Sequence, residues 1–392
     1  MALGHSKRPE MRDPTPSLVL LTLGLTWTAG TRDEPFFSSR YPMGSMQEGL
    51  DCDVLDRLYD RREFLGIVLD PPDFRPGSWI GAGKAIYDQA RGEFILTARP
   101  RRAENRVRGY AANIYGSKTG MEYRPVATLS KADVSRIAGM EIHSIEGTQL
   151  LRNPDDARWH LFLSVDTGGE FVWGGVEWET LLLTGDSLTG PWNSHGIVIP
   201  NDREFDSSQS RDATVDVIDG TWYCIYKAKN SSREERPALA TSEDGVDFEK
   251  RGTMTIDGED RLAFLSGTIF PSNNGPVLVG LETKLSDSRK RSPDVVYADD
   301  HGIGHGGGPP SNFVAYRLRA DRLDLQTVVR VPWTPLSPYE RPDHPLLGYS
   351  SLLIDPHEDR LLMYVESIDP QYTKAMGLNE TVERVLAYGI AL

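Results

Sequence analysis

The chain has 392 residues and carries 57 Asp and Glu against 43 Lys and Arg, a formal net charge of −14. An acidic chain repels phosphate backbones, and no block of Lys and Arg forms a basic patch, so nucleic acid is excluded as a partner. With 39% hydrophobic and 26% charged residues, the composition is that of a globular protein and excludes a disordered tail or a membrane protein.

Residues 1–60 are interpreted as a leader that precedes the folded domain and is partly disordered. Within it, Ser17–Thr28 is a mostly apolar run behind three basic residues, which resembles a signal peptide and is too short to span a bilayer. Asp13 and two prolines beside the run argue against export. Two interpretations stay open: a cytoplasmic protein, which these residues favour, or a secreted protein in which residues 11–30 act as a signal peptide.

Beyond residue 60, short runs of β-branched and aromatic residues alternate with Gly, Asn, Asp and Pro, which is typical of strands. One unit recurs at intervals of roughly 55 to 85 residues: a strand of small or polar residues, a turn, and an aromatic strand. First strands are expected at 79–88, 144–151, 211–217, 266–270 and 348–355, and second strands at 93–97, 159–164, 222–226, 277–281 and 360–365. Such units bury their faces only by stacking, so residues 64–392 are predicted to form an all-β, five-bladed β-propeller.

Three smaller patterns complete this prediction. Segments 117–120, 185–190 and 242–245 end in Gly and are followed by an aromatic residue, which indicates outer turns with positive φ. The last strand, 385–392, has no following partner, and we expect the N-terminal strand 64–69 to join the final blade and close the ring. Thr128–Gly139 is expected to form one short surface helix.

The third unit carries the most specific sequence motif. Arg211-Asp212-Ala213 precedes a strand that contains Trp222 and Tyr223. It resembles the Arg-Asp-Pro motif of the five-bladed propeller glycoside hydrolases of families 43 and 32, with Ala213 in place of Pro. The turn at 188–192 and the strand at 79–88 are also similar to those families. The sequence departs from them where the resemblance implies a first-blade acidic residue, because 81–83 holds no carboxylate.

The innermost strands of a propeller converge on its axis, so equivalent positions of different units are expected to line one funnel. These positions hold Lys84, Glu146, Asp212, Ser266 and Tyr349. Glycoside hydrolysis needs one protonated and one ionised carboxyl group around the scissile bond. We expect Glu146, whose apolar neighbours would raise its pKa, to be the proton donor and Asp212 to be its ionised partner. A structural role at a strand start is the alternative for both. Candidates for a third carboxylate are Asp70, Asp73, Glu282 and Glu366.

Basic and aromatic residues near the strand ends are candidates for substrate binding. Arg and Lys gathered at one site of an acidic protein favour an anionic group on the substrate, and aromatic rings stack on sugars. The candidates are Trp79, Lys84, Arg99, Arg108, Trp173, Arg211, Lys227 and Tyr349. His301 and His305 make an incomplete metal shell in a Gly-rich segment, so no metal or cofactor is expected, and a structural calcium ion in the channel is not indicated.

The sequence thus predicts a glycoside hydrolase with a carbohydrate substrate. A funnel closed beneath favours an exo-acting enzyme, and the resemblance implies an arabinofuranosidase-like or xylosidase-like activity. Two alternatives stay open. One is a non-catalytic glycan-binding propeller that lost the first-blade acid. The other is a glycoside phosphorylase or transglycosidase acting on an anionic sugar, which the basic residues favour.

Overall fold

The computed structural model describes residue 50 and residues 52–102, 108–168, 177–232, 234–284, 311–341, 347–373 and 381–392. These residues belong to one compact unit, Met46–Leu392. Nearly all of its regular structure is β-strand, as the sequence predicts. Within the described ranges, no helix has the length and apolar character needed to cross a membrane.

The strands pair into antiparallel sets of four, mostly in chain order. The first set is β2 (Trp79–Asp88), β3 (Glu93–Arg101), β4 (Ala111–Ser117) and β5 (Arg124–Ser130). The second is β6 (Ser144–Arg152), β7 (Trp159–Asp166), β8 (Trp178–Gly185) and β9 (Trp192–Ile199). The third is β10 (Gln209–Ile218), β11 (Thr221–Lys229), β12 (Glu235–Ser242) and β13 (Glu249–Thr253). The fourth is β15 (Ala263–Phe270), β16 (Val277–Lys284), β17 (Asn312–Arg319) and β18 (Asp324–Pro332), with the short β14 (Thr255–Ile256) parallel to β18.

The last set draws on both ends of the described chain. It contains β19 (Leu347–Ile354), β20 (Arg360–Ile368), β21 (Glu383–Ala391) and β1 (Arg62–Leu69). β1 pairs antiparallel with β21, so the strand pairing expected between the two ends of the domain is present. It covers the N–H and C=O groups that the outer edge of β21 would otherwise leave unpaired.

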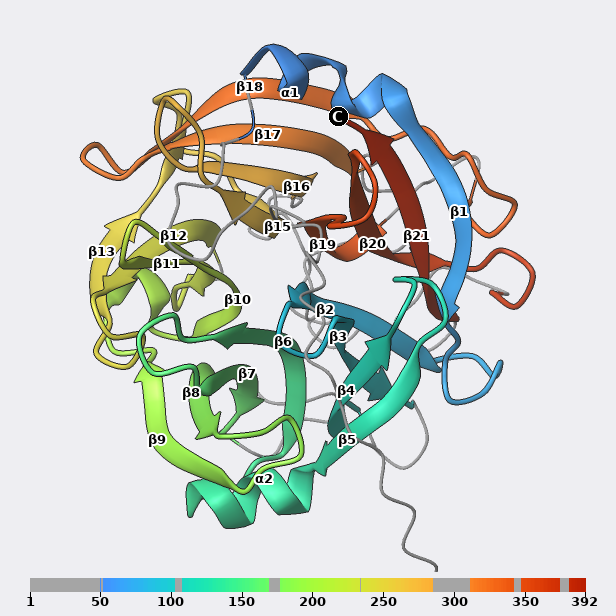
Figure 1. Ribbon diagram of the computed structural model, residues 1–392. Coiled ribbons are helices and arrows are strands. Elements are labelled where there is room, and N and C mark those ends of the chain that lie inside the picture. The colour runs from blue at the N-terminus through green and yellow to red at the C-terminus, as the bar shows by residue number, and fades with distance from the viewer. Residues whose placement is uncertain are drawn as a thin grey trace, which may run out of the picture. The chain divides into compact units, whose positions relative to one another are not determined.

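The first strands of the sets lie closest together. Figure 1 shows the sets around a common centre, with β2, β6, β10, β15 and β19 nearest to it. Hydrogen bonds join these inner strands without an intervening element: Ala85 N–H donates to Ser351 Oγ at 2.9 Å, and Leu352 N–H donates to Thr268 Oγ1 at 3.0 Å. Side chains at the starts of inner strands from different sets can therefore meet.

Four inner strands carry a one-residue bulge at the same place. The register shifts lie between Ala82 and Ala85, Ile145 and Thr148, Arg211 and Thr214, and Leu347 and Ser350. β15 pairs with β16 without such a shift. A bulge leaves an extra residue unpaired and turns its side chain in a new direction. In β10 this residue is Asp212, whose φ is 55°.

The expected surface helix is present as α2 (Lys131–Ala138). Ser130 accepts a hydrogen bond from Asp133 N–H, the Asp133 side chain accepts one from Ser130 N–H, and Gly139 ends the helix with a φ of 69°. These are a capping box and a left-handed C-cap, both encoded within a few residues. The 3₁₀ turn η3 (Glu204–Asp206) precedes β10.

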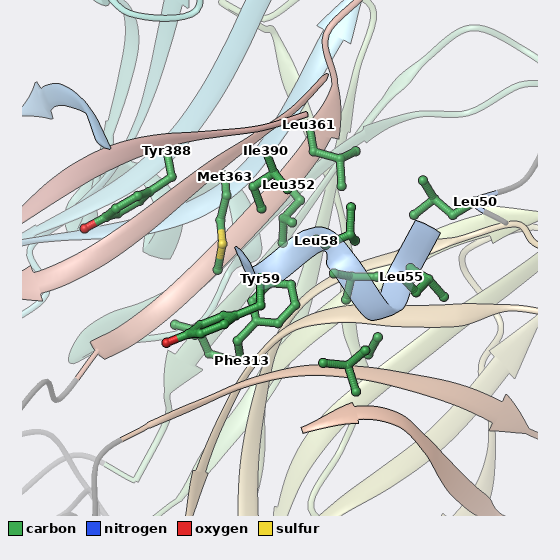
Figure 2. Close-up of a cluster of buried hydrophobic side chains, with 14 of the residues drawn as sticks. Leu50, Leu55, Leu58, Tyr59, Phe313, Leu352, Leu361, Met363, Tyr388 and Ile390 are labelled. Atoms are coloured by element: carbon green, nitrogen blue, oxygen red, sulfur yellow. The ribbon is translucent and has the colours of Figure 1, made fainter. Parts of the chain in front are cut away.

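A short helix and a 3₁₀ turn precede β1, within the range interpreted from the sequence as a leader. α1 (Cys52–Leu58) and η1 (Tyr59–Arg61) contribute buried apolar side chains to the core between the fourth and fifth sets. Figure 2 shows Leu55 and Leu58 in one buried cluster with Phe313 and Leu361. Residues three apart share one face of a helix, so α1 buries the face that carries Leu55 and Leu58. The strand pattern of the sequence did not predict this helix.

Candidate functional site

Charged side chains from several sets gather at the starts of the inner strands. Glu146 lies on β6 and Asp212 on β10, while Arg99 and Lys227 lie on the second strands β3 and β11. Arg108 follows β3 and joins the same group. All five side chains are almost completely buried. Burial of so many charges is costly unless they are paired, and their pairing determines what each group can do.

Glu146 is held between two arginines. Its Oε2 lies 3.1 Å from Arg99 Nη2 and its Oε1 lies 3.1 Å from Arg108 Nε. Burial of the fully covered carboxyl group raises its pKa, but the charges of Arg99, Arg108 and Arg211 outweigh that effect, so the pKa of Glu146 is lowered. The expected raised pKa is therefore wrong, because Glu146 faces arginines rather than the apolar residues beside it in sequence.

Asp212 lies between two cations. Its Oδ2 lies 2.7 Å from Lys227 Nζ and 3.6 Å from Arg211 Nε. Burial opposes ionisation, yet the charges of Lys227 and Arg211 lower the pKa of Asp212 to about 2. Its own N–H donates to Ser164 Oγ on β7 at 2.8 Å, which fixes the bulge next to the second set.

Glu366, one candidate for the third carboxylate, does reach this cluster. It comes from β20, and its Oε1 lies 3.7 Å from Arg99 Nη2. A Cβ atom on Gly81 would lie 2.7 Å from Glu366 Oε2, and one on Gly348 would lie 3.1 Å from Glu366 Cδ. Two glycines of inner strands therefore leave the space that this carboxylate fills. Glu366 stands beside the first inner strand, where the sequence lacks an acidic residue.

Glu383 is a fourth carboxylate of the cluster, and the sequence analysis missed it. It begins β21, two residues before the strand expected there. Glu383 lies opposite Ile368, and Glu366 lies opposite Val385, so the two glutamates are diagonal neighbours on one face of the sheet. Burial, the charge of Glu366 and a hydrogen bond with it raise the pKa of Glu383 well above its ordinary value. Glu383 therefore favours the protonated form.

Arg101 ends β3 beside the cluster. Its side chain is fully buried (0% exposed), and its guanidinium carbon lies 3.8 Å from the centre of the Trp79 ring. None of its three side-chain nitrogens has a hydrogen-bond partner among the described residues. Trp79 is only 3% exposed and donates its indole N–H to Thr381 O at 3.0 Å. Trp79 thus lies under Arg101 and does not present the open stacking surface that the sequence suggested.

Lys84 lies elsewhere along the inner strands. Its Nζ is 2.5 Å from Asp216 Oδ1 and 3.2 Å from Val215 O, both on β10. Asp216 stands four residues after Asp212, about 13 Å further along an extended strand. Burial lowers the pKa of Lys84, although the charge of Asp216 opposes that shift. The structure therefore does not bring Lys84 together with Glu146 and Asp212.

The other candidates from the sequence are more scattered. Glu282 pairs with Arg330 at 2.5 Å, Asp70 with Arg384 at 3.4 Å and Asp73 with Arg75 at 2.7 Å. Three further candidates, Trp173, His301 and His305, lie outside the described residues.

Among the residues described, no group of three or more His, Cys, Asp or Glu is placed to hold a metal ion. A cavity of about 400 Å³ lies away from the cluster and is lined by residues 195, 197–198 and 246–249.

Comparisons with known proteins identify relatives by structure only. No family model matches the chain, and no curated protein matches it in sequence. Similar structures include the β-1,2-mannobiose phosphorylase from Listeria innocua, with 12% identity, 83% of this chain and 94% of that chain covered, and a TM-score of 0.52. A family 117 glycoside hydrolase from Zobellia galactanivorans has 13% identity, 85% and 91% coverage and a TM-score of 0.51. Sucrose-6-phosphate hydrolase from Lactobacillus gasseri has 10% identity, 82% and 60% coverage and a TM-score of 0.56. Identities this low establish fold alone, and the chain therefore has the propeller-type fold of these glycoside hydrolases and this phosphorylase.

Proposed function

We propose that the chain is a five-bladed β-propeller glycoside hydrolase whose active site is the charged cluster around Glu146 and Asp212. The four-stranded sets are its blades, and the pairing of β1 with β21 closes its ring. The observation that carries the proposal is the meeting of buried carboxylates and cations from different blades at the starts of the inner strands. Such clusters of perturbed ionisable groups mark functional sites, and carboxylates are the groups that cleave glycosides.

The carboxylates divide into ionised and protonated groups. Glu146 and Asp212 are ionised and stabilise the positive charge that develops on the sugar ring in the transition state. A pKa of about 2 makes Asp212 a poor base, because proton transfer is efficient near the operating pH. Glu383 holds a proton next to Glu366, and this pair protonates the leaving oxygen. The proton donor is thus assigned to the last blade and not to Glu146.

An exo-acting mode follows from the base of the site. Further along the inner strands, Lys84 of β2 pairs with Asp216 of β10, and Asp216 accepts a hydrogen bond from Ile269 N–H of β15 at 2.8 Å. This contact joins three inner strands beneath the cluster and supports a funnel closed at one end, into which a chain end would enter. The resemblance to families 43 and 32 favours an arabinofuranoside or xyloside as the sugar.

The test measures cleavage of aryl glycosides and oligosaccharides by the wild type and by Glu146→Gln, Asp212→Asn and Glu366→Gln. We expect each variant to lose at least about 100-fold in kcat, the typical contribution of acid–base or charge-stabilising groups. Asp206→Asn is the control, because Asp206 is a buried carboxylate that pairs with Lys250 at 2.6 Å, outside the cluster. It should lower stability and leave kcat per folded molecule unchanged.

Two outcomes would replace this proposal with one of its alternatives. If the wild type binds oligosaccharides and releases no sugar, the protein is a glycan-binding propeller. If cleavage requires inorganic phosphate and yields a sugar phosphate, it is a phosphorylase. The second outcome is favoured by Arg101, a buried cation without a hydrogen-bond partner among the described residues.

A further inference from the structure

We infer that Arg101, with Arg99 and Arg108 beside it, forms a subsite that binds an oxyanion supplied by the ligand. The inference deepens the proposed function and rests on it for the place of this subsite next to the reacting groups. The binding of an anion itself can be measured whether or not the protein cleaves glycosides.

Arg99 and Arg108 have an acidic partner, whereas Arg101 has none at ion-pair distance among the described residues. Glu146 uses both of its oxygens on Arg99 and Arg108, each at 3.1 Å. Glu366 approaches Arg99 at 3.7 Å. The Arg101 guanidinium lies over the face of the Trp79 ring. Among the described residues, these two carboxylates therefore contact Arg99 and Arg108 and leave Arg101 without an acidic partner at ion-pair distance.

Glu383 does not supply the missing charge. Trp79 lies opposite Arg101 on β3 and opposite Glu383 on β21, so the two side chains flank one tryptophan. Burial and the charge of Glu366 favour the neutral, protonated form of Glu383. Burial and the neighbouring charge of Arg108 also lower the pKa of Arg101. The surroundings of Arg101 therefore disfavour its charged form unless an anion binds beside it.

An oxyanion would supply the hydrogen-bond acceptors and the negative charge that the Arg101 guanidinium lacks. Arginine presents a planar fork of N–H donors that matches two oxygens of a carboxylate or phosphate. An uncompensated charge in a buried site is strongly destabilising, and a bound oxyanion supplies the counter-charge. The Trp79 ring holds the other face of the guanidinium by a cation–π contact, so the fork is already oriented before the ligand arrives.

The oxyanion can come from two sources. One is a carboxylate on the substrate, as in a uronic acid. The other is inorganic phosphate acting as the glycosyl acceptor. In that reaction a phosphate oxygen bonds to the anomeric carbon, the glycosidic C–O bond breaks, and the leaving oxygen takes a proton.

The experiment follows thermal unfolding and calorimetric binding with sodium phosphate, sodium glucuronate and neutral glucose at constant ionic strength. We expect phosphate or glucuronate, and not glucose, to raise the unfolding temperature of the wild type in a saturable way. If only phosphate stabilises the protein, the bound oxyanion is the phosphate that acts as glycosyl acceptor. If only glucuronate stabilises it, the bound oxyanion is a carboxylate of the substrate. If neither anion stabilises the wild type, the inference is wrong.

Arg101→Met separates a ligand-binding role from a structural one. We expect it to bind the anion at least about tenfold more weakly and to unfold at a higher temperature than the wild type in anion-free buffer. A lower unfolding temperature with an unchanged anion response would overturn the inference. Arg101→Lys keeps the charge and removes the fork, so it should fold and bind weakly. Arg251→Met is the control, because the Arg251 side chain is 45% exposed and pairs with Glu249 at 2.8 Å.

Discussion

Replacing Lys84 with methionine would remove the cation that joins β2 to β10 beneath the site. The Lys84 side chain is 1% exposed and that of Asp216 is 13% exposed. Methionine fills a similar space without a charge, so the loss is mainly electrostatic. Removing one partner of a buried ion pair costs about 3–5 kcal/mol, because the remaining charge stays buried. Asp216 keeps a hydrogen bond from Ile269 N–H, so we expect a loss of about 3 kcal/mol in the free energy of unfolding at pH 7.

The size of this loss should depend on pH. Burial already raises the pKa of Asp216, and the charge of Lys84 opposes that shift. Without Lys84 the pKa of Asp216 rises further. A carboxyl group whose pKa is raised by folding stabilises the folded state below its unfolded pKa, and this contribution disappears as the pH rises through the folded value. The deficit of Lys84→Met relative to the wild type should therefore shrink as the pH falls from 7 toward 4.

Urea unfolding of the wild type, Lys84→Met, Asp216→Asn and the double variant at both pH values measures the coupling between the two residues. Lys118→Met is the control, since Lys118 is 62% exposed in its pair with Glu93 and should change stability by less than about 1 kcal/mol. If Lys84→Met costs less than about 1 kcal/mol but abolishes substrate turnover, Lys84 contacts substrate and the structural reading of this pair is wrong.

Three further changes test other parts of the molecule by urea unfolding. The pKa of Asp212, about 2 against an ordinary 3.8, corresponds to roughly 2 kcal/mol of stability. This contribution is present above the ordinary value and lost as the pH falls through 2, so the gap between the wild type and Asp212→Asn should narrow from pH 5 to pH 2. Gly83→Ala should cost about 1–3 kcal/mol, because its Cβ would collide with Thr97 and Thr148; a neutral result would mean that the inner strands can separate. Leu55→Ala should cost about 2–5 kcal/mol, since Leu55 is fully buried; an unchanged midpoint would show that α1 is not part of the folded core.

The elements that the sequence predicted well are those encoded locally. The hairpin of β10 and β11 is marked by Asp219-Gly220 between two strands, and Asp219 adopts a φ of 50° and Gly220 one of 78° in that turn. The capping box of α2 lies within four residues. In both cases the residues that decide the backbone are neighbours in the chain, so their pattern can be read without knowing the fold.

The chemistry of the site was predicted only in part. Asp212 was expected to be ionised because Arg211 is adjacent in sequence, and the two do interact. Glu146 was assigned a raised pKa from its apolar neighbours, but Arg99 and Arg108 come from another set of strands and reverse the direction. Glu383 gave no signal at all, because its protonated state depends on Glu366 across a strand pair.

The sequence by itself determined the repeating strand units, the turns between them, the pairing of the first strand with the last and the positions from which Glu146 and Asp212 reach the centre. These follow from local backbone preferences and from the alternation of apolar and polar residues. Only the tertiary structure decided which of the carboxylates is protonated, that Glu366 fills the space over Gly81, and that Lys84 pairs with Asp216 beneath the site. The physical reason is that the pKa of a buried group depends on charges a few ångströms away in space, and distant segments of the chain bring those charges there.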